Sequence, residues 1–161
     1  MVRTILSSDG VSGVVDLVMS GIESPKSVAV HPPSGVIFWS DLAKPSIERS
    51  DLSGDGRRVI VQDYIVLPAA ISIDGVQLRL YWIDVGLQSL SSCSLEGTKV
   101  RTLSPQKDVL SQSVSLSILE DWIYWSNVGE TEVSIRRLNK MTNSGHEIHP
   151  FPMVRYLVLL T

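Results

Sequence analysis

The residues of this chain that most resemble a catalytic or metal-binding group are acidic side chains at a regular spacing. Asp41 and Asp84 stand 43 residues apart, each at the end of a phrase with two aromatic residues, and Asn127 stands 43 residues further on. Such carboxylates could coordinate a metal ion or act as a general acid or base. A catalytic carboxylate need not be copied into every repeat, however. We therefore predict that the Asp41 and Asp84 oxygens accept structural hydrogen bonds from backbone amides of an adjacent strand or repeat.

Two other groups of residues resemble metal-binding patterns. The stretch Asp51–Gly56 reads DLSGDG and places oxygen ligands at EF-hand positions, but Gln62 stands where the bidentate Glu is required. The segment with His146, Glu147 and His149 is expected to be extended, so its two histidines point to opposite faces. We predict a polar hairpin turn for the first group and no zinc site for the second. No catalytic, cofactor-binding or metal-binding residue is expected, and no cofactor.

Three motifs with two aromatic residues each require a repeated set of strands to position them. They read FWSD, YWID and YWSN, and they begin 43 residues apart in both intervals. In each period, four short runs rich in apolar and β-branched residues are separated by turn residues such as Gly, Pro, Asp and Ser. Four-stranded antiparallel sheets that repeat at about this interval are typical of β-propeller blades. The predicted fold class is therefore all-β, with three full repeats and a partial one.

The same period divides the chain into predicted units. In the third repeat the first connection between strands is shorter by two residues, and the loop before it makes up the difference. The predicted units are a remnant of a preceding blade at 1–22, blades at 23–63, 64–106 and 107–150, and a terminal strand or unrelated tail at 151–161.

The residues of the three phrases are predicted to be structural. In a strand, Phe38 and Ser40 point to one face while Trp39 and Asp41 point to the other. Each phrase thus offers large apolar surfaces to both of the blades that flank it. The residues predicted to have this structural role are Phe38, Trp39, Asp41, Tyr81, Trp82, Asp84, Tyr124, Trp125 and Asn127.

Composition limits the remaining classes of protein. With 161 residues, of which 43% are hydrophobic and 19% charged, the chain is long and apolar enough for one globular domain. The net charge of -3 comes from scattered acids and bases, so nucleic acid is not an expected partner. The single cysteine, Cys93, cannot form an intrachain disulfide and is expected to be a small packing residue. Neither terminus reads as a signal peptide or a membrane-spanning helix.

The phrases and their surroundings resemble a known family. The segments IFWSD, LYWID and IYWSN are similar to the YWTD motif of the class B repeats of the low-density lipoprotein receptor family, and the flanking segments agree over about residues 14 to 148. The resemblance implies about half of a six-bladed extracellular propeller. An Ile-x-Arg that follows the motif in the family is recognised only at Ile47–Arg49, and the second repeat has Leu90 and Ser92 there. Asn127 replaces the motif acid, which suggests a less regular third blade.

The function that the resemblance implies is non-enzymatic. We expect a ligand-binding or scaffold segment of a receptor-related protein whose parent lies at the cell surface and takes up protein or lipoprotein ligands by endocytosis. The parent is expected to carry EGF-like modules beside the propeller. A Wnt co-receptor-type role within the same family is an alternative. The particular ligand does not follow from the sequence.

An enzyme of another class is a further alternative. Some six-bladed propellers are metal-dependent hydrolases that hold a central cation with side chains from several blades. Here Val28, Ala70 and Val114 are predicted at comparable inner positions, where such an enzyme needs polar ligands. His31 is expected to be a solvated residue of a Pro-rich turn. A run of about three blades would also leave two apolar blade faces open, which predicts self-association or loose packing.

Overall fold

The computed structural model describes residues 2–6, 12–18, 20–103, 110, 112–128 and 133–150. Within these residues the chain is built of strands joined by turns, with one short 3-10 helix, and no helix there is suited in length and apolarity to cross a membrane. The elements are β1 (Val2–Leu6), β2 (Ser12–Asp16), β3 (Pro25–His31), η1 (Pro32–Ser34), β4 (Val36–Asp41), β5 (Ser46–Asp51), β6 (Arg58–Val61), β7 (Pro68–Asp74), β8 (Arg79–Asp84), β9 (Ser89–Ser94), β10 (Arg101–Leu103), β11 (Ser113–Leu119), β12 (Trp122–Val128), β13 (Val133–Asn139) and β14 (Gly145–Pro150).

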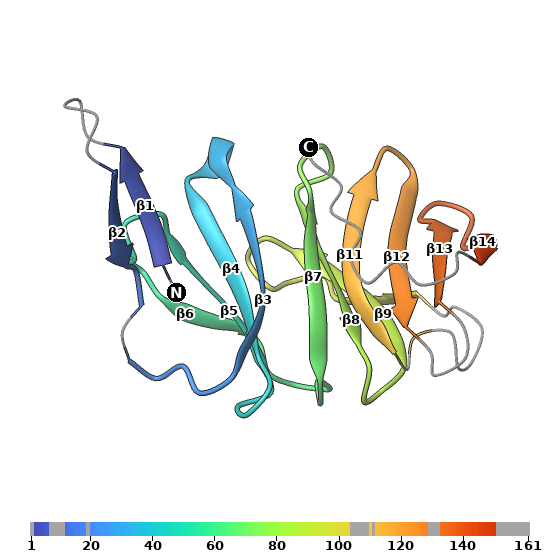
Figure 1. The fold of residues 1–161 in the computed structure, drawn as a ribbon, viewed down its shortest axis with the longest axis horizontal. Helices are drawn as coiled ribbons and strands as arrows, with labels where there is room; N and C mark the ends of the chain where they lie inside the picture. The colour runs from blue at the N-terminus through green and yellow to red at the C-terminus, as the bar shows by residue number, and fades with distance from the viewer. Residues whose placement is uncertain are drawn as a thin grey trace.

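Three four-stranded antiparallel sheets follow one another along the chain. Strands β3 to β6 form blade 1, β7 to β10 form blade 2, and β11 to β14 form blade 3, each with its strands in sequence order. Figure 1 shows the three sheets side by side, with β7 between β3 and β11. The amide of Ile71 in β7 donates to the Ser27 hydroxyl in β3 at 3.1 Å, so the first strands of blades 1 and 2 are directly joined. The all-β prediction of four-stranded blades is confirmed.

The connections agree with the predicted spacing. Blades 1 and 2 join their first two strands through four residues, at 32–35 and 75–78, whereas blade 3 uses only Glu120 and Asp121. The two-residue difference predicted for the third repeat is therefore present. Each sheet lies within one of the predicted units 23–63, 64–106 and 107–150. The unit boundaries remain predictions, and the predicted tail at 151–161 lies outside the described residues.

Apolar side chains fill the spaces between neighbouring blades. One cluster, between blades 1 and 2, contains Phe38 and Trp82, and the other, between blades 2 and 3, contains Tyr81 and Trp125. Because side chains alternate along a strand, the two adjacent aromatic residues of β8 reach two different clusters. The further buried members are Val36, Ile47, Val61, Ile65, Ile71, Leu80, Cys93 and Leu95 in the first cluster, and Ile83, Leu90, Leu110, Ile123 and Leu138 in the second.

A two-stranded sheet of β1 and β2 lies beside blade 1 (Figure 1). A Cβ on Gly54 would lie 2.6 Å from the carbonyl oxygen of Leu17, and a Cβ on Gly97 would lie 2.3 Å from that of Ile60. Both intervals are 43 residues, so the chain after β2 approaches blade 1 as β6 approaches blade 2. The assignment of residues 1–22 to a remnant of a preceding blade stays a prediction.

The face of blade 1 that points away from blade 2 is open near its first strand. Val28 pairs with Trp39, just as Ile71 pairs with Trp82 in blade 2. Val28 is 54% exposed, whereas Ile71, which is covered by blade 1, is 4% exposed. Val30 and Val59 on blade 1 are also exposed. The same repeat position is thus an interior residue in one blade and a surface residue in another.

We predict that Trp82→Ala will lower the free energy of unfolding by about 3 to 5 kcal/mol. The indole lies in the cluster between blades 1 and 2, and its removal leaves a cavity that both sheets must collapse to fill. Denaturant titration followed by near-ultraviolet circular dichroism measures the change. Val76→Ala, at a residue that is 93% exposed, is the matched control. A Trp82→Ala protein as stable as this control would contradict the blade assignment.

We propose further that the chain self-associates through the open face of blade 1. Exposed apolar patches of this kind are uncommon on soluble monomers. Light scattering after size-exclusion chromatography is expected to give a mass above 17.7 kDa. Val28→Lys combined with Val59→Lys, which charges the two ends of one cross-strand row, is expected to shift the protein toward monomer. A wild-type chain that stays monomeric and binds no dye for apolar surface would refute the proposal.

Candidate functional site

The three motifs occupy the same place in their blades, on the second strand. Residues Phe38–Asp41 lie on β4, Tyr81–Asp84 on β8, and Tyr124–Asn127 on β12. Asp41 is the partner of Pro25, Asp84 of Pro68 and Asn127 of Ser113, always at the start of the first strand. The three polar ends therefore lie at the same end of three separate blades. They are not brought together into one site.

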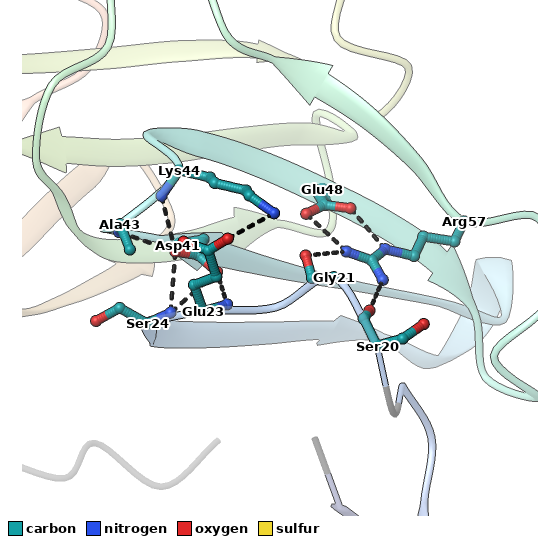
Figure 2. A network of polar contacts seen from close by, with 9 residues as sticks. All are labelled: Ser20, Gly21, Glu23, Ser24, Asp41, Ala43, Lys44, Glu48 and Arg57. Atoms are coloured by element: carbon teal, nitrogen blue, oxygen red, sulfur yellow. Dashed lines mark hydrogen bonds and ion pairs between the residues drawn. The ribbon is translucent and has the colours of Figure 1, made fainter.

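Asp41 is enclosed by backbone amides. Its buried carboxylate accepts hydrogen bonds from the amides of Glu23 (2.8 Å), Ser24 (3.1 and 3.2 Å), Ala43 (2.9 Å) and Lys44 (3.1 Å). Figure 2 shows these donors converging from the segment before β3 and from the turn after β4. Burial alone would raise the pKa of Asp41, but the amides more than offset it and the pKa is lowered. The carboxylate thus joins two loops of one blade.

Asp84 repeats this arrangement in blade 2. It is fully buried and accepts from the amides of Val66 (2.6 Å), Leu67 (3.0 Å) and Leu87 (2.9 Å). In blade 3, the Asn127 side-chain oxygen accepts from the Ser113 hydroxyl at 3.1 Å. The predicted backbone hydrogen bonds are present at both acids. They come from loops of the same blade, not from a neighbouring blade.

Trp39 is covered by a clamp that the sequence analysis missed. The Arg57 guanidinium lies over the Trp39 ring, 5.4 Å from its centroid, and bonds both Glu48 carboxylate oxygens at 2.7 and 3.0 Å. It also donates to the carbonyl of Gly21 at 2.9 Å and to that of Ser20 (Figure 2). The hydrogen bond to Glu48 raises the Arg57 pKa. The segment before β3 is thereby tied to the outer strands of blade 1.

Charged residues link blade 1 to blade 2. Arg49 on β5 donates to the carbonyl oxygen of Leu95 at 3.0 Å and also pairs with Glu96, which pairs with Arg58 on β6. The hydrogen bond from Arg49 lowers the pKa of Glu96. Glu96 and Arg58 are exposed, so these ion pairs contribute little to the free energy of folding and serve mainly to orient blade 1 relative to blade 2.

A buried ion pair links blade 2 to blade 3. Lys140 follows β13 and bonds Asp74 at the end of β7, and both side chains are almost fully buried. Asp74 also accepts from the amides of Val76 (3.0 Å) and Gln77 (2.9 Å). Burial would raise the pKa of Asp74, but Lys140 and the two amides lower it. Removing either charged partner would leave the other buried without compensation.

Three expectations from the sequence need correction. His31 is buried, not solvated, because it lies against the β7–β8 turn of blade 2, where a Cβ on Gly75 would be 3.6 Å from its Nε2. The register shows that the residues equivalent to Val28 are Ile71 and Leu116, not Ala70 and Val114, because all three pair with the motif tryptophan of the second strand.

The third correction concerns the Ile-x-Arg pattern, which also occurs in blade 3. Arg137 pairs with Tyr124 as Arg49 pairs with Phe38. Arg137 lies over the Trp122 ring at 4.2 Å from its centroid. The order Ile135-Arg136-Arg137 was visible in the sequence, and counting from the motif would have found it.

The remaining candidate groups are structural where the structure describes them. The DLSGDG stretch forms the β5–β6 turn, in which the Ser53 hydroxyl donates to Asp55 at 3.1 Å. Cys93 lies in the cluster between blades 1 and 2, and burial raises the pKa of its thiol to about 11. Among the described residues no group of three or more His, Cys, Asp and Glu side chains is suited to a metal ion. The side chains of His146, Glu147 and His149 lie outside this description.

Comparisons with known proteins agree with this geometry. Residues 35–74 match the family model of the low-density lipoprotein receptor repeat class B. This stretch runs from the turn before β4 to the end of β7, so it joins three strands of blade 1 to the first strand of blade 2. A segment of 59 residues is 41% identical to Vitellogenin receptor Yl of Drosophila melanogaster. It makes up 36% of this chain and 3% of that receptor.

Solved structures share the fold at low sequence identity. A chain in the crystal structure of a nidogen/laminin complex has a TM-score of 0.60 and 17% identity, with 89% of this chain and 68% of that chain covered. A gluconolactonase from Xanthomonas campestris has a TM-score of 0.64 and 15% identity, over 80% and 48% of the two chains. Hydrazine synthase of Kuenenia stuttgartiensis has a TM-score of 0.63 and 15% identity, over 81% and 36%.

Successive four-stranded sheets packed face to face define this chain as a segment of a β-propeller. Identities of this order with solved structures establish the fold alone. The repeat gives the finer assignment. Residues 35–74 carry the low-density lipoprotein receptor class B repeat, and the sheets around them have the fold of a β-propeller segment.

We predict that Asp84→Asn will cost about 2 to 4 kcal/mol of folding free energy. The amide nitrogen of Asn would face backbone donors, so at least one charge-assisted hydrogen bond is lost inside a buried site. Urea denaturation measures the loss. Asp63→Asn, at an exposed acid of the same loop, is the control and should change stability little. Equal stability of the two variants would contradict the assigned role of Asp84.

Acid is expected to remove the contribution of Asp41. Its folded pKa lies below the ordinary value of 3.8, so its stabilisation is present above that value and is lost as the pH falls through the folded pKa. The stability difference between wild type and Asp41→Asn should therefore be constant near neutrality and shrink below about pH 4. Denaturant titrations at stepped pH test this. A difference that grows in acid would reverse the sign of the argument.

Proposed function

We propose that the chain is a ligand-binding segment of a cell-surface receptor related to the low-density lipoprotein receptor. In this proposal its parent captures protein or lipoprotein ligands for endocytosis, with the propeller beside EGF-like modules. The observation that supports it best is the class B repeat at 35–74 within a run of successive blades. The 41% identity to a vitellogenin receptor over 59 residues supports the receptor class.

The described geometry supports binding rather than catalysis. Asp41 and Asp84 direct their oxygens at backbone amides, which leaves them poorly placed to act on a substrate. The equivalent inner positions carry Val28, Ile71 and Leu116, which offer no ligand to a central cation. The likeness to a gluconolactonase, at 15% identity, concerns the fold and carries no activity to this chain.

The single cysteine is compatible with an extracellular location. Cys93 is fully buried, and burial keeps its thiol protonated at neutral pH. Since the thiolate is the reactive form, this residue is protected from oxidation and from disulfide exchange. A segment without a disulfide partner can therefore persist outside the cell with a free thiol.

Binding of defined ligands tests the proposal. The purified chain is immobilised on a biosensor and exposed to purified low-density lipoprotein and to purified vitellogenin. Saturable binding of at least one of them to the folded chain, and not to Trp82→Ala, is the expected result. Failure of both to bind would refute the proposed receptor role. A lactone-hydrolysing turnover that disappears in a folded Asp41→Asn or Asp84→Asn protein would also refute it.

A further inference from the structure

The two buried carboxylates hold the same loop positions in blades 1 and 2 but display different side chains. Around Asp41 the bonded amides belong to Glu23, Ser24, Ala43 and Lys44, and Lys44 pairs with Glu23 at 2.7 Å. This end of blade 1 is polar and its charges are paired. Its structure shows that the loop framework itself does not require apolar side chains.

In blade 2 the same positions are apolar and exposed. Val66, Leu67 and Leu87 stand 43 residues after Glu23, Ser24 and Lys44, and their amides all bond Asp84. All three side chains are more than one third exposed. Because one carboxylate holds all three amides, the apolar side chains are presented by a fixed backbone. We call these residues, together with Tyr64, the Tyr64 patch.

Tyr64 has an unusual backbone conformation for an aromatic residue. Its φ is 53°, in the left-handed region, and it stands 43 residues after Gly21, whose φ is 68°. A bulky residue in this region costs about 1 kcal/mol or more, and glycine does not. The Tyr64 side chain is 96% exposed, so packing within the chain gives no return for that strain. An exposed tyrosine kept at a position suited to glycine points to a role outside the folded chain.

We propose that the Tyr64 patch is a protein-binding surface that takes an extended segment with apolar side chains next to a basic one. This deepens the proposed function and rests on it. Tyrosine is enriched among the residues that dominate the binding energy of protein interfaces, and a backbone that is already fixed lowers the ordering cost of binding. Asp63 is exposed next to Tyr64 and takes part in none of the described ion pairs, so it favours a basic residue on the ligand.

A lipid surface fits the patch less well than a protein. Membrane-binding surfaces combine apolar residues with Lys or Arg that attract anionic headgroups. The Tyr64 patch contains no basic residue, and its neighbour Asp63 is an acid. An anionic bilayer would be repelled at this position.

Selection from a library of random dodecapeptides displayed on phage tests the proposal on the whole chain. We expect enrichment of peptides that combine Leu, Ile or aromatic residues with Lys or Arg. For the enriched peptides, Tyr64→Gly should weaken binding by about tenfold or more. The same change should leave the melting temperature equal or higher, because glycine relieves the backbone strain. Loss of binding without loss of stability separates an interface role from a structural one.

Two further variants sharpen the test. Leu87→Lys places in blade 2 the residue that blade 1 has at the equivalent position, and it should also weaken binding by about tenfold. Val76→Ser is the matched control, since Val76 is 93% exposed in the β7–β8 turn at the opposite end of the strands, and it should leave binding unchanged. No enriched peptide, or enriched peptides that bind Tyr64→Gly as well as wild type, would overturn the proposal.

Binding of lipid vesicles and of the receptor ligands is measured with the same two proteins, wild type and Tyr64→Gly. Tyr64-dependent binding to phosphatidylcholine–phosphatidylserine vesicles, in place of peptides, would overturn the assignment to a protein ligand. If lipoprotein or vitellogenin binds wild type and Tyr64→Gly equally, the proposed receptor role stands and the patch is refuted. If Tyr64-dependent peptides are found but neither probe binds, the surface stands and the proposed receptor role is refuted.

Discussion

The packing of one sheet face against the next is the interaction on which the rest of this structure depends. A four-stranded sheet has two faces, and in blade 2 both are covered, by blade 1 on one side and blade 3 on the other. The adjacent aromatic pair of β8 serves this geometry directly, since Tyr81 and Trp82 enter different clusters. This dependence is clearest where a neighbouring blade is missing. Val28 has the register position of Ile71, but no blade covers it and its side chain is exposed. Local strand pairing is the same in both blades, and only the neighbour differs.

Polar side chains fix the relative position of neighbouring blades, which the apolar contacts alone do not determine. Apolar packing is non-directional and would tolerate a sheet that slides on its neighbour. Ion pairs at the blade edges, Arg49 with Glu96 and Lys140 with Asp74, set the relative positions of consecutive blades. Within blades 1 and 2, Asp41 and Asp84 tie the incoming segment to the turn after the second strand. The loops can therefore vary in side chain without losing their backbone path, as the polar loops around Asp41 and the apolar loops around Asp84 demonstrate.

Periodicity made the fold predictable, while contacts between blades limited the prediction of detail. The 43-residue recurrence of two aromatics and an acid located β4, β8 and β12, and alternation along the strand indicated which face of the sheet each side chain occupies. His31 was misjudged because its burial depends on Gly75 of the next blade, which no local pattern reveals. The inner positions were misaligned by one residue in blade 2, where counting 43 from Val28 gives Ile71, and by two in blade 3, where the connection between the first two strands is two residues shorter. The Arg57 clamp on Trp39 joins residues far apart in sequence with no repeat equivalent to signal it. The peculiarity of Tyr64 lies in a dihedral angle, which composition does not show.

The matched repeat begins before β4 and ends with β7, and is therefore out of phase with the blade by one strand. A tandem duplication or deletion of one 43-residue period anywhere in such a gene would join a sequence to its own equivalent position. Each blade of the product would still have one face that packs on the preceding blade and one that packs on the following blade, wherever in the period the gene was joined. Blade number can thus change during evolution while the apolar packing of face on face is preserved, and closure of the ring selects against the wrong number. The cost of this freedom is that a chain with an unclosed run of blades folds each sheet correctly and still keeps two unmatched ends.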